Sequence, residues 1–136
     1  MKYTISDLKQ VVSEGRTPPP CDKTMQVVVD YAEEGIAKGV WNVDHKYING
    51  LGVVMGGFLS SAADILMAYA ISSKLANDQS FVSIDLDTTF HRPAMEGEIE
   101  VVARVEKMGR TLAYVVAELK QNEKKVATCV SSLLIQ

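Results

Sequence analysis

Hydrophobic and polar residues alternate with a period of two through most of the second half of the chain. In residues 80–93 one mostly apolar face contains the even-numbered positions Val82, Ile84, Leu86, Thr88 and Phe90. Residues 97–109, 110–121 and 125–136 repeat the alternation, and a polar Asn-Glu-Lys turn separates the last two segments. Period-two patterns joined by short turns predict four antiparallel strands in a meander.

The first half of the chain predicts a short helix and two strands. Residues 7–15 have an amphipathic pattern that ends at Gly15, which is typical of a short helix with a glycine C-cap. Three prolines within residues 16–22 predict a rigid extended connector, because proline fixes φ and lacks an N–H. The segments 24–32 and 35–44 are rich in β-branched and aromatic residues and predict two strands.

A long helix is expected between these two halves. The glycine-rich loop 45–57 leads into it, and we expect the helix to run from about Gly57 to Leu75 and to end near Asn77. Apolar residues, many of them small, cover most of its circumference, so we expect the sheet to enclose it. The predicted fold class is therefore α+β: two strands, one central helix and four further strands wrapped around it.

Length, composition and charge predict one globular domain and exclude some partners. A chain of 136 residues, 47% of them hydrophobic and 23% charged, suits a single domain over 1–136. Residues 1–23 form its N-terminal helix and proline-rich connector, and residues 24–136 form its core. The formal net charge of −3 provides no basic field for nucleic acid or for a membrane surface. The N-terminus lacks a signal-peptide apolar region and the two cysteines stand alone, so we expect a cytoplasmic protein with free thiols.

One carboxylate interrupts the apolar helix. Between Lys46 and Lys74, Asp64 is the only side chain with a formal charge at neutral pH. A carboxylate in apolar surroundings is costly unless it is hydrogen-bonded or used in chemistry. The residues leave two interpretations open: a general base or nucleophile, or a buried structural aspartate satisfied by hydroxyls such as those of Ser60 or Ser61.

Two glycines, Gly56 and Gly57, open the same helix. A helix N-terminus offers free N–H donors and the positive end of the helix dipole, and a residue without Cβ permits close approach. Aimed at a carbonyl oxygen, such donors form an oxyanion hole worth about 2.7–4 kcal/mol per donor. The alternative is that the glycines only permit tight packing where the chain turns into the helix. Composition alone does not distinguish between the two interpretations.

The ordered motif around these residues resembles that of a known family. The string NGLGVVMGGFLSSAAD, residues 49–64, is similar to the signature of hotdog-fold acyl-CoA thioesterases of the PaaI-like, phenylacetate-degradation branch of the 4-hydroxybenzoyl-CoA thioesterase superfamily. The segments 83–94, 107–119 and 124–135 extend the resemblance over roughly residues 24–135. The positions that match the signature in type and spacing are Asn49, Gly52, Gly56, Gly57 and Asp64.

The resemblance implies a hotdog fold and hydrolysis of the thioester of an acyl- or aryl-acyl-CoA. It implies that Asp64 is catalytic and that the backbone N–H groups of Gly56 and Gly57 polarise the thioester carbonyl. Ser83 matches a position where some relatives use a hydroxyl to orient the water. Asn49 could hold the carbonyl or the water, or could simply cap its loop.

The resemblance also points to the residues that would bind the substrate. The phosphates of CoA need Lys or Arg, although each basic residue could equally be a solvated turn residue. CoA is part of the substrate, and neither a separate cofactor nor a metal is expected, because the two histidines lack ligand spacing. The expected substrate- and CoA-binding residues are Met55, Phe90, His91, Arg92, Lys107, Gly109, Arg110 and Thr111.

The spacing within the helix bears on assembly. Gly56 and Asp64 are eight residues apart, which is roughly 12 Å along a helix. Reacting groups must approach to about 3–3.5 Å, so one carbonyl cannot contact both residues of one chain. If both serve one thioester, they belong to different subunits. The resemblance implies a homodimer with interface active sites and a further pairing of two such dimers into a dimer of dimers.

Three alternatives to a thioesterase stay open. Met55 stands where the family usually has His, which favours an acyl-CoA-binding hotdog protein with little hydrolysis. A hotdog dehydratase or hydratase typically pairs Asp with His, and no His lies between Lys46 and Lys74. A purely structural dimer module would leave Asp64 unexplained.

Overall fold

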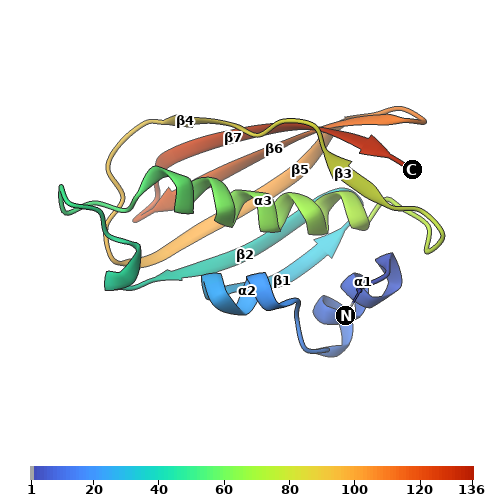
Figure 1. Ribbon diagram of the computed structural model, residues 1–136, viewed down its shortest axis with the longest axis horizontal. Coiled ribbons are helices and arrows are strands. Elements are labelled where there is room, and N and C mark those ends of the chain that lie inside the picture. Colours follow the sequence, from blue (N-terminus) through green and yellow to red (C-terminus); the bar gives the residue numbers. More distant parts are fainter. Residues whose placement is uncertain (1) are drawn as a thin grey trace.

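Helix α3 (Gly56–Ser72) lies across the concave side of a curled antiparallel sheet (Figure 1). The structure is a computed structural model and describes residues 2–136. Every strand pair in the sheet is antiparallel. The other helices are α1 (Ile5–Glu14), α2 (Pro20–Met25) and the 3-10 helix η1 (His45–Tyr47), and the strands are β1 (Val27–Glu33), β2 (Ile36–Val43), β3 (Phe81–Ser83), β4 (Asp87–Phe90), β5 (Gly97–Met108), β6 (Leu112–Gln121) and β7 (Lys124–Ile135). The predicted α+β architecture, an antiparallel sheet around one long helix, is confirmed.

The sheet runs in the order β1-β2-β5-β6-β7-β3, and β4 also pairs with β7. Inward-facing residues of the central strands and the apolar residues of α3 form the core, in which Trp41, Leu66, Ile99 and Val115 have no exposed surface. Gly39 lets α3 approach β2 closely, because a Cβ there would lie 2.6 Å from a backbone oxygen and 3.2 Å from the Leu66 side chain.

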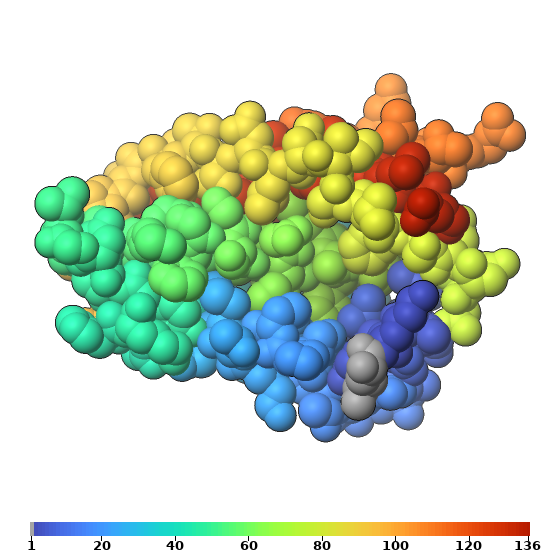
Figure 2. Space-filling model, viewed as in Figure 1, coloured from blue at the N-terminus to red at the C-terminus, as the bar shows by residue number. Residues whose placement is uncertain are grey.

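The sheet does not enclose α3 completely, which corrects the sequence prediction. The sheet is open, and between its two edges a strip of α3 reaches the surface between the N-terminal segment and segment 80–93 (Figure 2). In the single chain Gly57 and Asp64 are exposed, and Ser60, Ser61 and Ala68 are half-buried. We call these five residues the open stripe of α3.

Segment 80–93 is two short strands rather than the single predicted strand. Ser83 pairs with Leu133 and Asp87 with Val130, so four steps along this segment lie opposite three steps along β7. The extra residue is a bulge around Asp85, whose carboxylate accepts a hydrogen bond from the Ser132 N–H at 2.8 Å.

The bulge decides which side chains face the helix. A shift of one residue moves side chains to the opposite face of a strand. Ser83, before the bulge, lines a cavity together with residues of α3, and Thr88, after it, bonds to the Ser60 hydroxyl at 2.7 Å. The prediction that one apolar face runs through residues 80–93 is therefore wrong. Four of its residues are instead well exposed on the single chain, namely Val82, Ile84, Leu86 and Phe90.

The N-terminal elements also differ from the predicted boundaries. Helix α1 begins at Ile5 because Thr4 and Asp7 form a capping box. The connector predicted for 16–22 is wrong in its last three residues, since Pro20 begins α2 and β1 starts only at Val27. Proline suits the first turn of a helix, where its missing N–H has no intrahelical partner.

Helix α3 starts one residue before the predicted Gly57 and ends at Ser72, three residues before the predicted Leu75. Within residues 2–136, no helix combines the length and the apolar character needed to cross a membrane.

Candidate active site

The N-terminus of α3 presents two free backbone donors. Met55 is the N-cap residue and has no side-chain capping bond, while the Phe58 N–H bonds back to the Met55 carbonyl at 3.0 Å. Within the described chain, neither the Gly56 nor the Gly57 N–H has a hydrogen-bond acceptor. Free donors at the positive end of a helix can accept a carbonyl oxygen or an anion.

The two glycines differ in their surroundings. The Phe90 ring lies against Gly56, where an added Cβ would come within 2.6 Å of the ring. Tight packing therefore explains why residue 56 is glycine. At Gly57 an added Cβ would meet only the Met55 methyl group, at 3.3 Å. Gly57 is thus the more accessible of the two donors.

A cavity of about 390 Å³ lies beside this helix start. It brings together four of the predicted site residues, Gly56, Phe90, His91 and Arg92. The His91 ring bonds to the Thr128 hydroxyl at 2.8 Å, and Arg92 is exposed.

Asp64 lines a second cavity, of about 220 Å³, together with Ser83. Its carboxylate is exposed on the open stripe, contrary to the buried position that the sequence suggested. Ser60 and Ser61 bond to the carbonyls of Gly56 and Gly57, and within residues 2–136 Asp64 has no hydrogen-bond partner. The neighbouring cavity walls remove water from the carboxylate, and this desolvation raises its pKa.

Asn49 acts as a loop cap in this structure. Its side-chain oxygen accepts hydrogen bonds from the N–H groups of Leu51, at 2.9 Å, and Val53, at 3.3 Å. These bonds fix the loop that leads to α3. A direct contact with substrate would have to come from its amide nitrogen.

The predicted CoA-binding residues form two groups at opposite ends of β7. Lys107 lies near the end of β5, and Gly109, Arg110 and Thr111 form the β5–β6 turn, where the Thr111 carbonyl accepts a hydrogen bond from the Ile135 N–H at 2.8 Å. The other group includes His91, whose N–H bonds to the Val126 carbonyl. Val126 and Ile135 are nine positions apart along the strand, which is roughly 30 Å. One chain therefore does not bring the two groups together.

Asp22 and Tyr69 are a buried polar pair that sequence analysis missed. Asp22 is 3% exposed and accepts a hydrogen bond from the Tyr69 hydroxyl at 2.6 Å and from the Cys21 thiol at 3.4 Å. Burial raises the pKa of the Asp22 carboxyl, and burial next to Asp22 raises the pKa of Tyr69. The available signal was Pro20, which marks a helix start and places Asp22 in its first turn.

Asp22→Asn is expected to raise the unfolding midpoint near neutral pH. Because the folded pKa is raised above 3.8, the folded state binds this proton more tightly than the unfolded state. Stability from this group therefore falls as pH rises from the unfolded pKa through the folded pKa. Asparagine removes the buried charge and keeps an oxygen for Tyr69, which should stabilise the fold by about 1 kcal/mol or more.

Thermal unfolding across the acidic range measures this effect. The exposed Asp30 is the control, and Asp30→Asn should leave the midpoint unchanged. A lower midpoint for Asp22→Asn, or an unchanged pH dependence, would show that the folded state favours the charged carboxylate.

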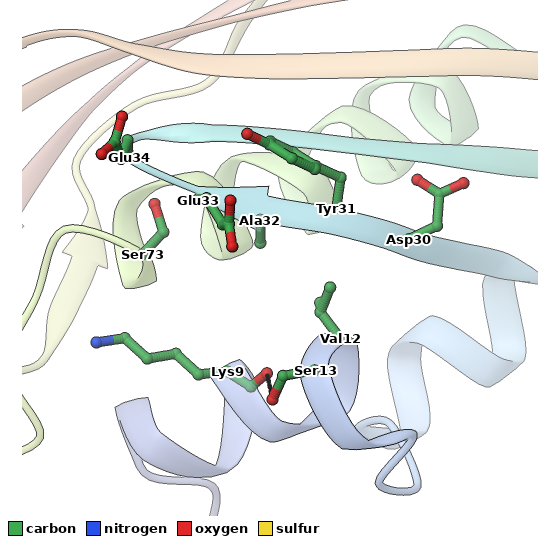
Figure 3. A pocket seen from close by; sticks show the side chains of 9 residues that line it. All are labelled: Lys9, Val12, Ser13, Asp30, Tyr31, Ala32, Glu33, Glu34 and Ser73. Carbon is green, nitrogen blue, oxygen red and sulfur yellow. Dashed lines mark hydrogen bonds between the residues drawn. The ribbon is translucent and has the colours of Figure 1, made fainter.

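A larger cavity than these two, of about 640 Å³, lies elsewhere, between α1 and the end of β1 (Figure 3). Asp30, Glu33 and Glu34 line it on the strand side and Lys9 on the helix side. The Lys9 ammonium already donates to the Leu75 carbonyl at 2.9 Å. No predicted site residue lines this cavity, so its size does not make it the candidate site.

Comparison with known proteins identifies the family. The model of the thioesterase superfamily matches residues 51–128, from the loop before α3 into β7. The chain belongs to the thioesterase superfamily. The matched region includes Gly56, Gly57, Asp64 and Ser83.

Relatives of this thioesterase-superfamily protein support the same assignment. It is 34% identical over 87 residues to "Putative esterase PA0474" of Pseudomonas aeruginosa, a match covering 63% of this chain and 65% of that protein. The chain thus spans somewhat under two thirds of the length of that curated relative.

Two solved structures resemble it over most of their length. A phenylacetic acid degradation-related protein of Ralstonia eutropha JMP134 is 26% identical with a TM-score of 0.87, covering 93% of this chain and 98% of that one. The E. coli PaaI protein of the phenylacetic acid degradation operon is 28% identical with a TM-score of 0.77, covering 84% and 86%. The hotdog fold and the PaaI-like resemblance predicted from residues 49–64 are confirmed.

Proposed function

We propose that this protein is a single-domain acyl-CoA thioesterase that hydrolyses an acyl- or aryl-acyl-CoA to the free acid and CoA. The observation that carries the proposal is Asp64: an unpartnered, partly desolvated carboxylate that shares a cavity with the Ser83 hydroxyl. Because the chain belongs to the thioesterase superfamily, the reaction that we propose for this carboxylate is thioester hydrolysis.

Two subunits would share each active site. Gly57 and Asp64 lie on the same open stripe, seven residues or roughly 10 Å apart. A second helix packed along this stripe in the opposite direction would bring its own Asp64 to the first helix's Gly57. The small residues of the stripe permit such close packing, and the exposed Val82, Ile84 and Leu86 offer apolar area beside it.

The chemistry follows from this arrangement. The Asp64 carboxylate removes a proton from water while the water oxygen attacks the thioester carbonyl carbon, and Ser83 holds the water. Negative charge on the carbonyl oxygen is stabilised by the N–H of the partner subunit's Gly57. The C–S bond then breaks, and the proton passes to the departing CoA sulfur. Direct attack by Asp64 is the alternative: its carboxylate would displace the CoA thiolate and form a mixed anhydride with the acyl group. If water then attacks the Asp64 carbon of this anhydride, a single turnover in oxygen-labelled water would place label in the Asp64 carboxylate.

The acyl group would occupy the cavity beside Asp64. Its walls are mostly apolar, with Leu8, Pro19, Ile65, Ala68 and Phe81 among them, which favours an apolar acyl or aryl group. For the CoA phosphates we propose Arg110 and Lys107, and next Arg92 and His91. Because the two groups lie far apart in one chain, one CoA would use one group from each subunit.

A panel of acyl-CoAs with free-thiol detection tests the function. We expect thiol release from at least one medium-sized acyl- or aryl-acyl-CoA at a rate proportional to enzyme. Binding of CoA esters without release of thiol from any of them would refute hydrolysis and favour the second candidate, an acyl-CoA-binding hotdog protein. That candidate is favoured by Met55 and by the Phe90 ring that covers Gly56.

Met55→His is expected to leave turnover unchanged or to raise it by less than about tenfold, the effect of one added hydrogen bond. The side chain is exposed at the N-cap, so the replacement should fold normally. The kcat for the best substrate of the panel measures the effect. A loss of activity would show that the methionine itself contributes to the site.

A further inference from the structure

The N-terminal segment, residues 2–25, forms one wall of the cavity beside Asp64. Leu8 of α1 and Pro19, Cys21 and Asp22 near the start of α2 line this wall, opposite Ser83 of β3. Neither α1 nor α2 takes part in the sheet, and both lie along the open side of α3 (Figure 1). The position of this wall therefore depends on side-chain contacts rather than on strand pairing.

Few polar contacts hold the segment. At the α1 end, the Ser6 N–H bonds to the Asn77 side chain at 2.8 Å, in an exposed position, and the Lys9 ammonium donates to the Leu75 carbonyl at 2.9 Å. At the α2 end, the Tyr47 hydroxyl donates to the Thr24 carbonyl at 3.0 Å. The bond between Asp22 and Tyr69 is buried, and both residues line the cavity that contains Asp64.

Packing alone does not explain a carboxylate at position 22. Asp22 is almost completely buried, and no Lys or Arg in the described chain pairs with it. A buried charge lowers stability compared with an apolar residue of similar volume. A short hydrogen bond has a preferred direction, however, and it fixes α2 on α3 at one distance and one orientation.

We propose that Asp22 is a positioning residue: through its hydrogen bond to Tyr69 it holds residues 19–22 as the wall of the acyl cavity, and thereby selects the acyl groups that the enzyme accepts. The proposal rests on the thioesterase function proposed above and adds a determinant of its substrate range. An acetyl group extends one methyl beyond the carbonyl and needs only the space beside Asp64. A longer acyl group reaches the wall and depends on its position.

Tyr69→Phe tests the proposal by removing one hydroxyl. We expect kcat/KM for hexanoyl-CoA to fall about tenfold, mainly through KM, while kcat/KM for acetyl-CoA stays within about twofold. Asp22→Asn keeps an acceptor for the Tyr69 hydroxyl and should retain the wild-type ratio of the two substrates. If Asp22 had a purely structural role, Tyr69→Phe would lower kcat/KM for both substrates by the same factor.

Tyr47→Phe is the matched control. It removes a hydroxyl that also holds α2, but Tyr47 does not line the cavity beside Asp64. We expect this variant to keep the wild-type ratio of hexanoyl-CoA to acetyl-CoA activity. A change in that ratio equal to the change in Tyr69→Phe would overturn the specific role of Asp22.

Amide hydrogen exchange gives a readout without substrate. In Tyr69→Phe we expect faster exchange in α2, with the amides of the sheet unchanged, and in Asp22→Asn we expect exchange in α2 no faster than in the wild type. An active Tyr69→Phe enzyme with an unchanged substrate ratio would refute the positioning role alone. A wild-type protein that hydrolyses no acyl-CoA would refute the proposed function, and the selectivity role with it.

Discussion

Asp64→Asn is expected to lower kcat at least about 100-fold, the lower range for a general acid or base. The amide has nearly the same shape as the carboxylate but cannot accept a proton from water or attack the thioester. The fold should be intact, because Asp64 is exposed in the single chain and bonds to no described residue. Steady-state kinetics on the best acyl-CoA, together with thermal unfolding, measure both properties.

Asp87→Asn is the matched control for this variant. Asp87 is an exposed aspartate on β4, and it lines neither of the two cavities at the candidate site. We expect wild-type turnover for Asp87→Asn. Turnover equal to wild type in Asp64→Asn would show that its carboxylate has a structural role only.

The pH profile provides a second signature of Asp64. Desolvation raises its pKa above the ordinary value of 3.8. The charged form is the active base, so kcat/KM should increase as pH rises through this raised pKa, and the acid limb should lie above that of an ordinary aspartate. If this acid limb disappears in Asp64→Asn, it reports the titration of Asp64. If the limb is unchanged, another group is responsible for it.

Mixed dimers are expected to recover activity from two inactive variants. The pair is Asp64→Asn and Gly57→Val, which fills the space in front of the helix N-terminus. Gly57 is the better glycine to replace, because a side chain at Gly56 would collide with Phe90. Each homodimer should be nearly inactive, since every site in it lacks either the carboxylate or access to the donor.

In a mixed dimer one site carries both substitutions and the other carries neither. With random exchange half of the dimers are mixed and half of their sites are intact, so activity should recover to about a quarter of wild type. Gly50→Val is the control for adding a side chain, because nothing lies within 4 Å of an added Cβ there. Absence of recovery despite verified exchange, or an active monomer on sizing, would contradict a site shared across the interface.

The sequence alone predicted much of the fold and the position of the helix. Period-two alternation depends on the two faces of a strand, and the central helix shows as a run that is apolar on nearly all sides. These are local properties, and β5, β6, β7 and the start of α3 accordingly lie close to their predicted positions. The motif at residues 49–64 was sufficient to indicate the family, because its glycines and its aspartate keep their spacing along the chain.

Only the tertiary structure decided which of those residues meet. The bulge at Asp85 exchanges the two faces of segment 80–93. It arises from the pairing with β7, which cannot be inferred from the local alternation of residues. The Asp22–Tyr69 pair joins residues 47 positions apart, and the Phe90 ring reaches Gly56 of α3 from strand β4. Asp64 looked buried because its sequence neighbours are apolar, yet the open edge of the sheet leaves it exposed on the single chain. Burial and contact depend on which distant segments the fold brings together, and a periodic pattern reports only which side of its own element a residue occupies.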